Sequence, residues 1–501
     1  MKKESRSILA WLFAPVVFAA LFLPASSTAQ RPAETTITAS RNAALIAATN
    51  EVLKETSEVR QLSILRPVRS SAQSRAEIER MIMKSLDEET TPAQMHAVEI
   101  TLKKLGLAPP DFQYRALMIG LLTEQVAGYY DPKTREFHLA DWIDLDGQKP
   151  IMAHELTHAL QDQHFNLRRF EHWPKGDSDA EMAAHALIEG DATLAMALYV
   201  ASNPLRSLAL LKSLGTASMS SVELDKAPRA VRESLLFPYQ EGLNWTHAIY
   251  RRGGWKEVSQ AFTLLPQSTE QILHPEKYFA NEAPVKVTLP DITLLLNGSG
   301  QRSEVGGQRP EISRVAGRAA AGSAGILPAF SGTDFQSVIR GTGVPPANHA
   351  QDARAAWKRL DYDVQGEWGF YLILDQFLKS PAESRRAAAG WGGDRFAVYE
   401  GPKGEVLIAS LSTWDTENDA REFFDAYVKR TELRYPGAER LDSVDPATRN
   451  SKLETRNSEA FSFRTSEGTV IAELRGSHVL ILESIPDRVD SNALLKSLRQ
   501  W

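Results

Sequence analysis

The sequence HELTH at positions 154–158 places His154 and His158 four residues apart, with Glu155 directly after the first histidine. In an α-helix, residues i and i+4 lie on one face, one turn apart, so both imidazoles can bind the same metal ion. Glu155 lies about 100° round the helix, where its carboxylate can reach a water molecule on that ion. A zinc ion lowers the pKa of such a water toward neutrality, and the carboxylate can take its proton as it attacks a carbonyl. The spacing therefore indicates metal-assisted hydrolysis.

The remaining residues of this helix agree with that interpretation. At 100° per residue, Met152, Leu156, Ala159 and Leu160 lie on the side opposite the histidines. We therefore expect one face of the helix to pack on a core and the other to face a cleft. Asp162 extends the histidine side by one turn and is a candidate partner that orients an imidazole. The alternative is a solvated helix with incidental histidines.

Two histidines leave a catalytic zinc site incomplete, since such sites usually have a third protein ligand and one open position. The next strong helix, predicted over 178–202, carries Glu189 on the side opposite its leucines, so Glu189 is the predicted third ligand. The alternative for Glu189 is a carboxylate with an ordinary structural partner. His185, one turn earlier, is either a ligand in its place or a residue that lines the cleft. Weaker ligand candidates on the same helix are Asp191, Glu181 and Asp179.

HELTH on one helix and EGDAT (189–193) on the next resemble the gluzincin branch of the zincin metallopeptidases, to which thermolysin belongs. The resemblance covers roughly 126–200, and it is closest to uncharacterised secreted bacterial members. It implies zinc bound by His154, His158 and Glu189, with Glu155 as general base. It also implies an edge strand above the active-site helix that pairs with extended peptide substrate, and the β-hairpin predicted over 126–140 is in the right position for this.

A tetrahedral intermediate would need a hydrogen-bond donor besides the metal. The candidates are Tyr129 and Tyr130 in the hairpin, Tyr239 in FPYQEG and His274 in ILHPEKY. For each tyrosine the alternative is a core or edge aromatic, and for His274 it is a hydrogen bond within a turn.

Composition limits the other possibilities. The chain has 501 residues, too many for one ordinary domain, and a formal net charge of −6, which gives no reason to expect nucleic acid or an acidic membrane surface as partner. It has no cysteine, so a transition-metal site must use His, Asp or Glu.

The first residues have the layout of a secretory signal peptide. Basic residues precede an apolar run from Ile8 to Leu23, and Ser27-Thr28-Ala29 supplies small residues before Gln30. We expect cleavage there and an extracytoplasmic protein, secreted or periplasmic. The alternative is an uncleaved anchor; nothing later is long and apolar enough to cross a bilayer.

The expected fold class is α+β, with a mainly helical zincin-like domain that contains a short hairpin and a C-terminal α+β domain of order β-β-α-β-β-α. Gly, Ser, Ala, Arg and Pro dominate 297–355, which predicts a disordered linker or insertion, and 445–460 is predicted to be a shorter polar insertion. The predicted organisation is a signal peptide (1–29), an N-terminal helical region (30–110), a catalytic domain (111–296), the linker (297–355) and the C-terminal domain (356–501). Whether the N-terminal helices form a prosegment or belong to the catalytic fold stays open.

The function that these observations predict is a secreted zinc-dependent metallopeptidase acting on peptide or protein substrates, without nucleic acid and without a membrane contact beyond the export signal. The alternative is a non-catalytic zincin-fold binding or scaffold protein in the cell envelope. A third possibility is metal-assisted hydrolysis of a non-peptide amide. The presence of Glu155 favours catalysis, because a structural two-histidine site does not need it.

Overall fold

The structure is a computed structural model that describes residues 34–125, 128–142, 145, 147–173, 176–207, 222–298, 356–441 and 458–499. The predicted signal peptide, nearly all of the predicted linker and most of the predicted insertion at 445–460 lie outside the described residues. Among the described residues, no helix is both long and apolar enough to cross a membrane.

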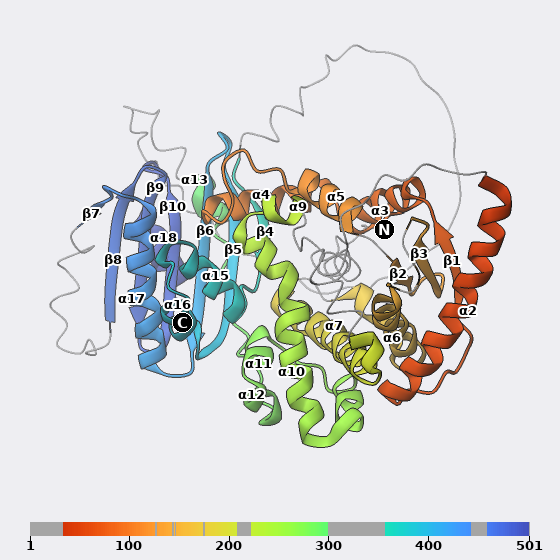
Figure 1. Ribbon diagram of the computed structural model, residues 1–501. Helices are drawn as coiled ribbons and strands as arrows, with labels where there is room; N and C mark the ends of the chain where they lie inside the picture. The colour runs from red at the N-terminus through yellow and green to blue at the C-terminus, as the bar shows by residue number, and fades with distance from the viewer. Residues whose placement is uncertain are drawn as a thin grey trace, which may run out of the picture.

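The first part of the chain is mainly helical, with one small sheet (Figure 1). Its strands are β1 (Arg69–Gln73), β2 (Gly128–Asp131) and β3 (Glu136–Ala140). Its helices are α2 (Glu34–Arg60), α3 (Arg75–Glu89), α4 (Pro92–Lys104), α5 (Tyr114–Gln125), α6 (Lys149–Phe165), the 3-10 helix η1 (Leu167–His172), α7 (Ser178–Ala201), α9 (Val222–Lys226), α10 (Arg229–Ala261), α11 (Thr269–Leu273), α12 (Pro275–Phe279) and α13 (Thr293–Gly298).

The predicted hairpin is confirmed as β2 and β3, which pair antiparallel with Tyr130 opposite Phe137. Strand β1 was not predicted; it pairs parallel to β3 and gives the order β1-β3-β2. Its sequence, RSSAQ, has a single apolar residue, so it lacks the alternation that marks a half-buried strand. Strand β2 is therefore an edge of the described sheet.

Local sequence explains where the two site-bearing helices begin and end. Helix α6 has Pro150 in its first turn and ends at Asn166, whose φ of 56° is left-handed. Helix α7 is capped by the Asp177 carboxylate, which accepts a hydrogen bond from the amide of Ala180. The helix therefore begins at Ser178, as predicted, and ends at Ala201, one residue before the predicted end.

The C-terminal part contains a seven-stranded sheet of order β4-β5-β6-β10-β9-β8-β7 in which the paired strands are antiparallel. Its strands are β4 (Lys358–Asp363), β5 (Trp391–Glu400), β6 (Val406–Trp414), β7 (Glu439–Leu441), β8 (Ser458–Thr465), β9 (Gly468–Arg475) and β10 (His478–Ile485). Its helices are α15 (Gly366–Leu378), α16 (Pro381–Ala388), α17 (Glu417–Arg434) and α18 (Ser491–Leu498).

The α+β class predicted from the sequence is confirmed, but the β-β-α-β-β-α order is incomplete. Strand β4 and helices α15 and α16 come before the first predicted hairpin, and the stretch predicted as two strands holds three, β8 to β10. The three strands are joined by polar turns of two residues each, Ser466-Glu467 and Gly476-Ser477.

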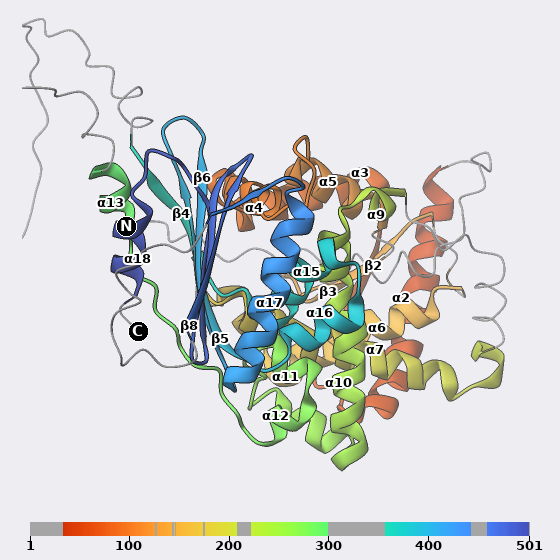
Figure 2. The same ribbon diagram turned by 90° about the vertical axis from the view of Figure 1, so that its left-hand side faces the viewer.

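The sheet is covered on both faces (Figure 2): α15, α16 and α17 lie on one side, and α13 and α18 on the other. The core under α15 and α17 continues without interruption into the helical part, where Trp368 and Phe370 belong to the same buried cluster as Leu187, Phe237 and Trp245. The sheet is therefore packed against the helical part through a shared core.

Candidate metal centre

Helix α6 is buried on all sides, because every residue from Ile151 to Asp162 is buried. The predicted apolar face is confirmed: Met152, Leu156, Ala159 and Leu160 share a core cluster with side chains of α2 and β3. The prediction that the histidine face opens to a cleft is wrong, since His154, Glu155 and His158 are exposed by only 0%, 2% and 5%. Helix α7 packs on α6, and α10 in turn packs on α7.

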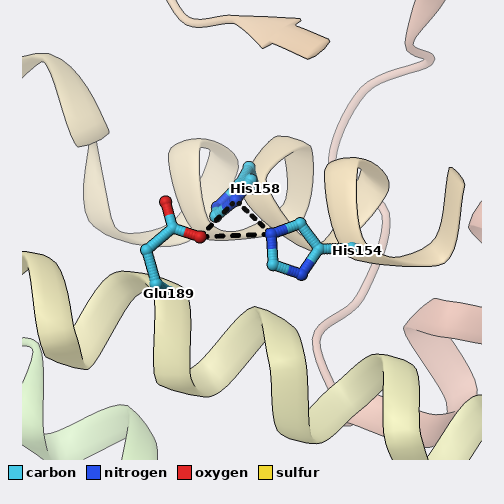
Figure 3. Close-up of side chains that lie close together, drawn as sticks. All are labelled: His154, His158 and Glu189. Carbon is cyan, nitrogen blue, oxygen red and sulfur yellow. Dashed lines mark hydrogen bonds and ion pairs between the residues drawn. The ribbon is translucent and has the colours of Figure 1, made fainter. Parts of the chain in front are cut away.

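The structure brings His154, His158 and Glu189 together in one buried group (Figure 3). The Glu189 Oε2 atom lies 3.1 Å from His154 Nε2 and 3.5 Å from His158 Nε2, and the two Nε2 atoms are 3.2 Å apart. Tetrahedral zinc with bonds of about 2.0–2.1 Å would hold its ligand atoms about 3.3 Å apart. The three spacings therefore fit a tetrahedral metal ion bound by one atom of each residue.

A close helix crossing places Tyr239 over this group. A Cβ atom added to Gly190 of α7 would lie 2.1 Å from the carbonyl oxygen of Gly242 in α10, so the two backbones touch at a point where only glycine fits. One turn before Gly242, the Tyr239 ring stacks on His154 with ring centroids 6.1 Å apart. Burial, the nearby carboxylates of Glu189 and Glu155 and a hydrogen bond to Glu189 raise the pKa of Tyr239 well above its ordinary value, so its hydroxyl keeps its proton and donates it to the Glu189 carboxylate in a hydrogen bond.

Glu155 lies beside the group and is held by the edge strand. Its Oε2 atom accepts a hydrogen bond of 3.0 Å from the backbone amide of Tyr130 in β2. Burial raises the pKa of Glu155 to about 8, although the charge of His158 acts in the opposite direction. The Tyr130 side chain was predicted as a candidate donor to the tetrahedral intermediate, whereas the structure brings the backbone amide of Tyr130 to Glu155.

The two imidazoles and the carboxylate shift one another's pKa values. Burial disfavours charge on His158, but the Glu189 carboxylate outweighs it and raises the pKa of His158 to about 9. Burial acts against charge on Glu189 as well, yet His158 and the hydrogen bond to His154 lower its pKa to about 2. The pKa of His154 is lowered by burial. One proton is thus held among three ligand atoms, where a cation would take its place.

A chain of hydrogen bonds begins at the Nδ1 atom of His158, on the other side of the ring from the Nε2 atom that faces Glu189. Its Nδ1 atom lies 2.9 Å from Gln161 Oε1, and Gln161 Nε2 donates to Asp191 Oδ2 at 2.8 Å. Asp191 in turn pairs with Arg60 at 2.5 Å, and both side chains are fully buried. Sequence reasoning missed Gln161 and Arg60. Gln161 could have been found, because it is three residues after His158 on the same helix face; Arg60, 131 positions before Asp191, has no local signal.

Other predicted site residues have different roles. Asp162 does not orient an imidazole: its carboxylate accepts hydrogen bonds from Arg66, the Tyr130 hydroxyl and the amide of Leu167. His274 pairs with Glu367 at 2.9 Å, on the side of α11 and α15. His185 lies near the group, since burial lowers its pKa to about 4 while Glu189 and His158 both act on it.

Two of the weaker ligand candidates on α7 have partners outside the metal-binding group. Asp191 pairs with Arg60, as described above, and Asp179 binds the hydroxyl and amide of Thr269. Tyr129 donates to Gln73 at 3.1 Å and its ring lies against His138. Of the candidate donors named from the sequence, Tyr239 is thus the one whose side chain the structure places at the metal-binding group.

Comparison with known proteins covers a different part of the chain. The family model described as "Domain of unknown function (DUF8575)" matches residues 353–493, the region of the seven-stranded sheet. No curated protein and no solved structure matches the chain. The match does not include α6, α7 or α10, so the case for the metal centre rests on its own geometry.

Proposed function

We propose that the protein is an exported zinc-dependent peptidase with a gluzincin-like centre. The observation that carries this proposal is the spacing of His154, His158 and Glu189, which suits tetrahedral metal, with Glu155 alongside. Two histidines and one glutamate are a donor set of catalytic zinc sites. The export signal predicted at 1–29 supports an extracytoplasmic location, and α6 and α7 with the small sheet support a zincin-like arrangement.

Each protein group then has a defined task. When bound, zinc would supply a Lewis acid that lowers the pKa of water and polarises a carbonyl. Glu155 takes the proton of the attacking water; the Tyr130 amide on Oε2 fixes its orientation. A divalent cation nearby would lower the pKa of Glu155 from about 8, because opposite charge favours the ionised carboxylate. The Tyr239 hydroxyl, which lies beside Glu189, would turn to donate a hydrogen bond to the developing oxyanion.

The proposed substrate is a peptide or protein, because of the edge strand. Strand β2 ends the order β1-β3-β2 among the described strands, and the amide of Tyr130 points away from β3 toward Glu155. An extended peptide added along this edge would pass next to the catalytic carboxylate.

The test is metal analysis with a peptide-library assay on the wild type, Glu155→Gln and Glu473→Gln. Glu473 on β9 is a matched control, because its carboxylate is only 3% exposed and pairs with Arg475 and with Arg499. We expect about one zinc ion per chain in all three proteins, with hydrolysis lowered roughly 10²- to 10⁴-fold only in Glu155→Gln. Equal rates in the wild type and Glu155→Gln would contradict the proposal.

The burial of the centre favours a second candidate, a scaffold protein with a structural metal. Glu189 is exposed by only 1% and His154 by 0%, so a substrate reaches them only if α10 or the hairpin moves. In that case, zinc removal lowers the melting temperature and no peptide is cleaved. The same metal analysis and assay separate the two candidates.

A further inference from the structure

A cavity of about 490 Å³ lies where the helical part meets the C-terminal part. Its walls come from α4, α7 and α10 on one side and from β4 and α15 on the other. Prominent apolar lining residues are Val98, Leu102, Met182, Leu235, Trp368 and Leu372. This volume is within the range of small-ligand pockets and is larger than one amino-acid side chain needs.

The cavity reaches the surroundings of the metal centre at two points. His185 lines the cavity and is also close enough to Glu189 and His158 for both to affect its pKa. It precedes Glu189 by four residues of α7, about 6 Å along the helix axis. Pro238 lines the cavity as well, and the next residue, Tyr239, stacks on His154. The cavity lining therefore includes a residue one helical turn from Glu189 on α7 and the residue next to Tyr239 on α10.

The charged residues that border the cavity favour apolar ligands over acidic ones. Asp179, Asp361 and Asp363 border it. One guanidinium, that of Arg359, also borders it, and it is paired with Asp291 at 3.2 Å. Burial and the neighbouring Asp361 raise the pKa of Asp363 to about 7, which indicates that negative charge is poorly compensated here. An acidic side chain would be repelled, whereas apolar side chains would replace water along the Leu, Val, Met and Trp walls.

We propose that this cavity binds the apolar side chains of the peptide substrate next to the scissile bond, so that the C-terminal region acts as the specificity element of the enzyme. The inference rests on the proposed function and assigns a role to the region that the family model matches. Helix α15 and strand β4 form one wall, and the helices that carry the metal centre form the other. Neither part alone encloses the space.

The test fills the cavity from each wall separately. Leu372→Trp adds bulk from α15 and Val98→Trp adds it from α4, while Leu433→Trp on the exposed side of α17, 48% exposed, is the control. The peptides are identical except for leucine, alanine or glutamate on either side of the cleaved bond. Thermal unfolding and zinc content are measured for each variant, so that a folding defect is recognised.

For the wild type and the control, we expect kcat/KM to be roughly 60-fold higher for the leucine peptide than for the alanine peptide, from about three buried carbons, and lowest for the glutamate peptide. In both cavity-filled variants the leucine preference should fall below threefold. An unchanged preference in variants that are folded and hold zinc would overturn the inference while the peptidase proposal stands.

A second readout separates the two proposals. Binding of a fluorescently labelled leucine peptide is measured with Glu155→Gln, alone and combined with Leu372→Trp. If the wild type cleaves no peptide, the proposed function fails; binding that Leu372→Trp weakens at least tenfold then still supports the cavity as the binding site. Binding that Leu372→Trp leaves unchanged would overturn the inference.

Discussion

Two carboxylates of this protein, Glu189 in α7 and Glu483 in β10, are buried to the same extent, each with 1% exposure. Burial opposes ionisation in both, and in both cationic neighbours outweigh it and lower the pKa. The neighbours differ. Glu189 faces two imidazoles, whereas Glu483 pairs with the guanidiniums of Arg430 and Arg434.

That difference decides what each centre can do. A guanidinium keeps its charge at all accessible pH values and has no lone pair to offer a metal. Arg430 and Glu483 therefore form a buried ion pair that can only stabilise the fold, and the Tyr427 hydroxyl donates a further hydrogen bond to Glu483. An imidazole, by contrast, can lose its proton within the accessible pH range and then presents a nitrogen lone pair that a metal can bind. An equally buried carboxylate thus stabilises one part of the molecule, and under the proposed function it binds metal in the other.

The largest effects are expected when the negative charge of Glu483 or that of Glu189 is removed. Glu483→Gln should lower the free energy of unfolding by about 3–5 kcal/mol, because it leaves buried arginines uncompensated, and should leave zinc affinity unchanged. Glu189→Gln should weaken zinc roughly 100-fold, since one of four ligands in sites worth about 10–16 kcal/mol corresponds to roughly 3 kcal/mol. Chemical denaturation and competitive zinc titration measure the two. Full zinc affinity in Glu189→Gln would remove it from the ligand set.

Those residues of the candidate site that are related by local spacing could be predicted from the sequence. His154, Glu155 and His158 follow from one helical turn, and the outward face of α7 indicated Glu189. The burial of the site could not be predicted, because it depends on the contact between Gly190 and Gly242, 52 positions apart. Non-local pairs such as Arg60 with Asp191 leave no periodic signal, and the polar strand β1 has none either.

Substitution of Arg60 tests whether the metal-binding group also depends on a buried ion pair. It is the last residue of α2 and the buried partner of Asp191, which continues the chain to Gln161 and His158. Arg60→Met keeps much of the apolar stem but leaves the carboxylate unpaired, so we expect a loss of about 3 kcal/mol in stability. Arg80→Met on α3 is the control, at a position that is exposed.

The same variant bears on the N-terminal helices, which the sequence left open as a prosegment or a part of the fold. Because Arg60 compensates a charge beneath the metal centre, α2 should be required in the active protein. Proteolytic removal of residues up to Arg60 with retained stability and zinc binding would instead mark α2 as a prosegment.

The pH dependence of zinc affinity should separate the two centres. The proton on His158, with its pKa of about 9, must leave before metal binds, so affinity should fall about tenfold per unit below pH 9. This gives roughly 100-fold between pH 8 and pH 6. A raised folded pKa also means that the metal-free protein loses stability as pH rises from about 6.5 to 9.

The Glu483 centre should not respond in that range. Its lowered pKa contributes stability that is complete above the ordinary value of 4.5 and is lost only as pH falls further. Zinc titration and thermal unfolding between pH 6 and pH 9 check both statements. A zinc affinity independent of pH over this range would contradict the proton-sharing arrangement of His158 and Glu189.

The smallest expected effect concerns Gln161, which links the predicted ligand His158 to the buried ion pair of Asp191 and Arg60. Gln161 connects His158 Nδ1 to Asp191, and loss of such a partner typically costs 10–100-fold in metal affinity. We expect Gln161→Leu to weaken zinc by roughly tenfold, less than loss of a ligand, because the imidazole stays in place but is no longer oriented. The matched control is Gln163→Leu on the same helix, whose carbonyl binds the amides of Leu65 and Arg66 away from the metal group. Gln161→Glu retains an acceptor for His158 and should recover part of the affinity, although its charge lies next to Asp191. If Gln161→Leu and Gln163→Leu bind zinc equally, His158 is oriented by helix packing alone, and the chain from Arg60 serves stability only, as the arginines around Glu483 do.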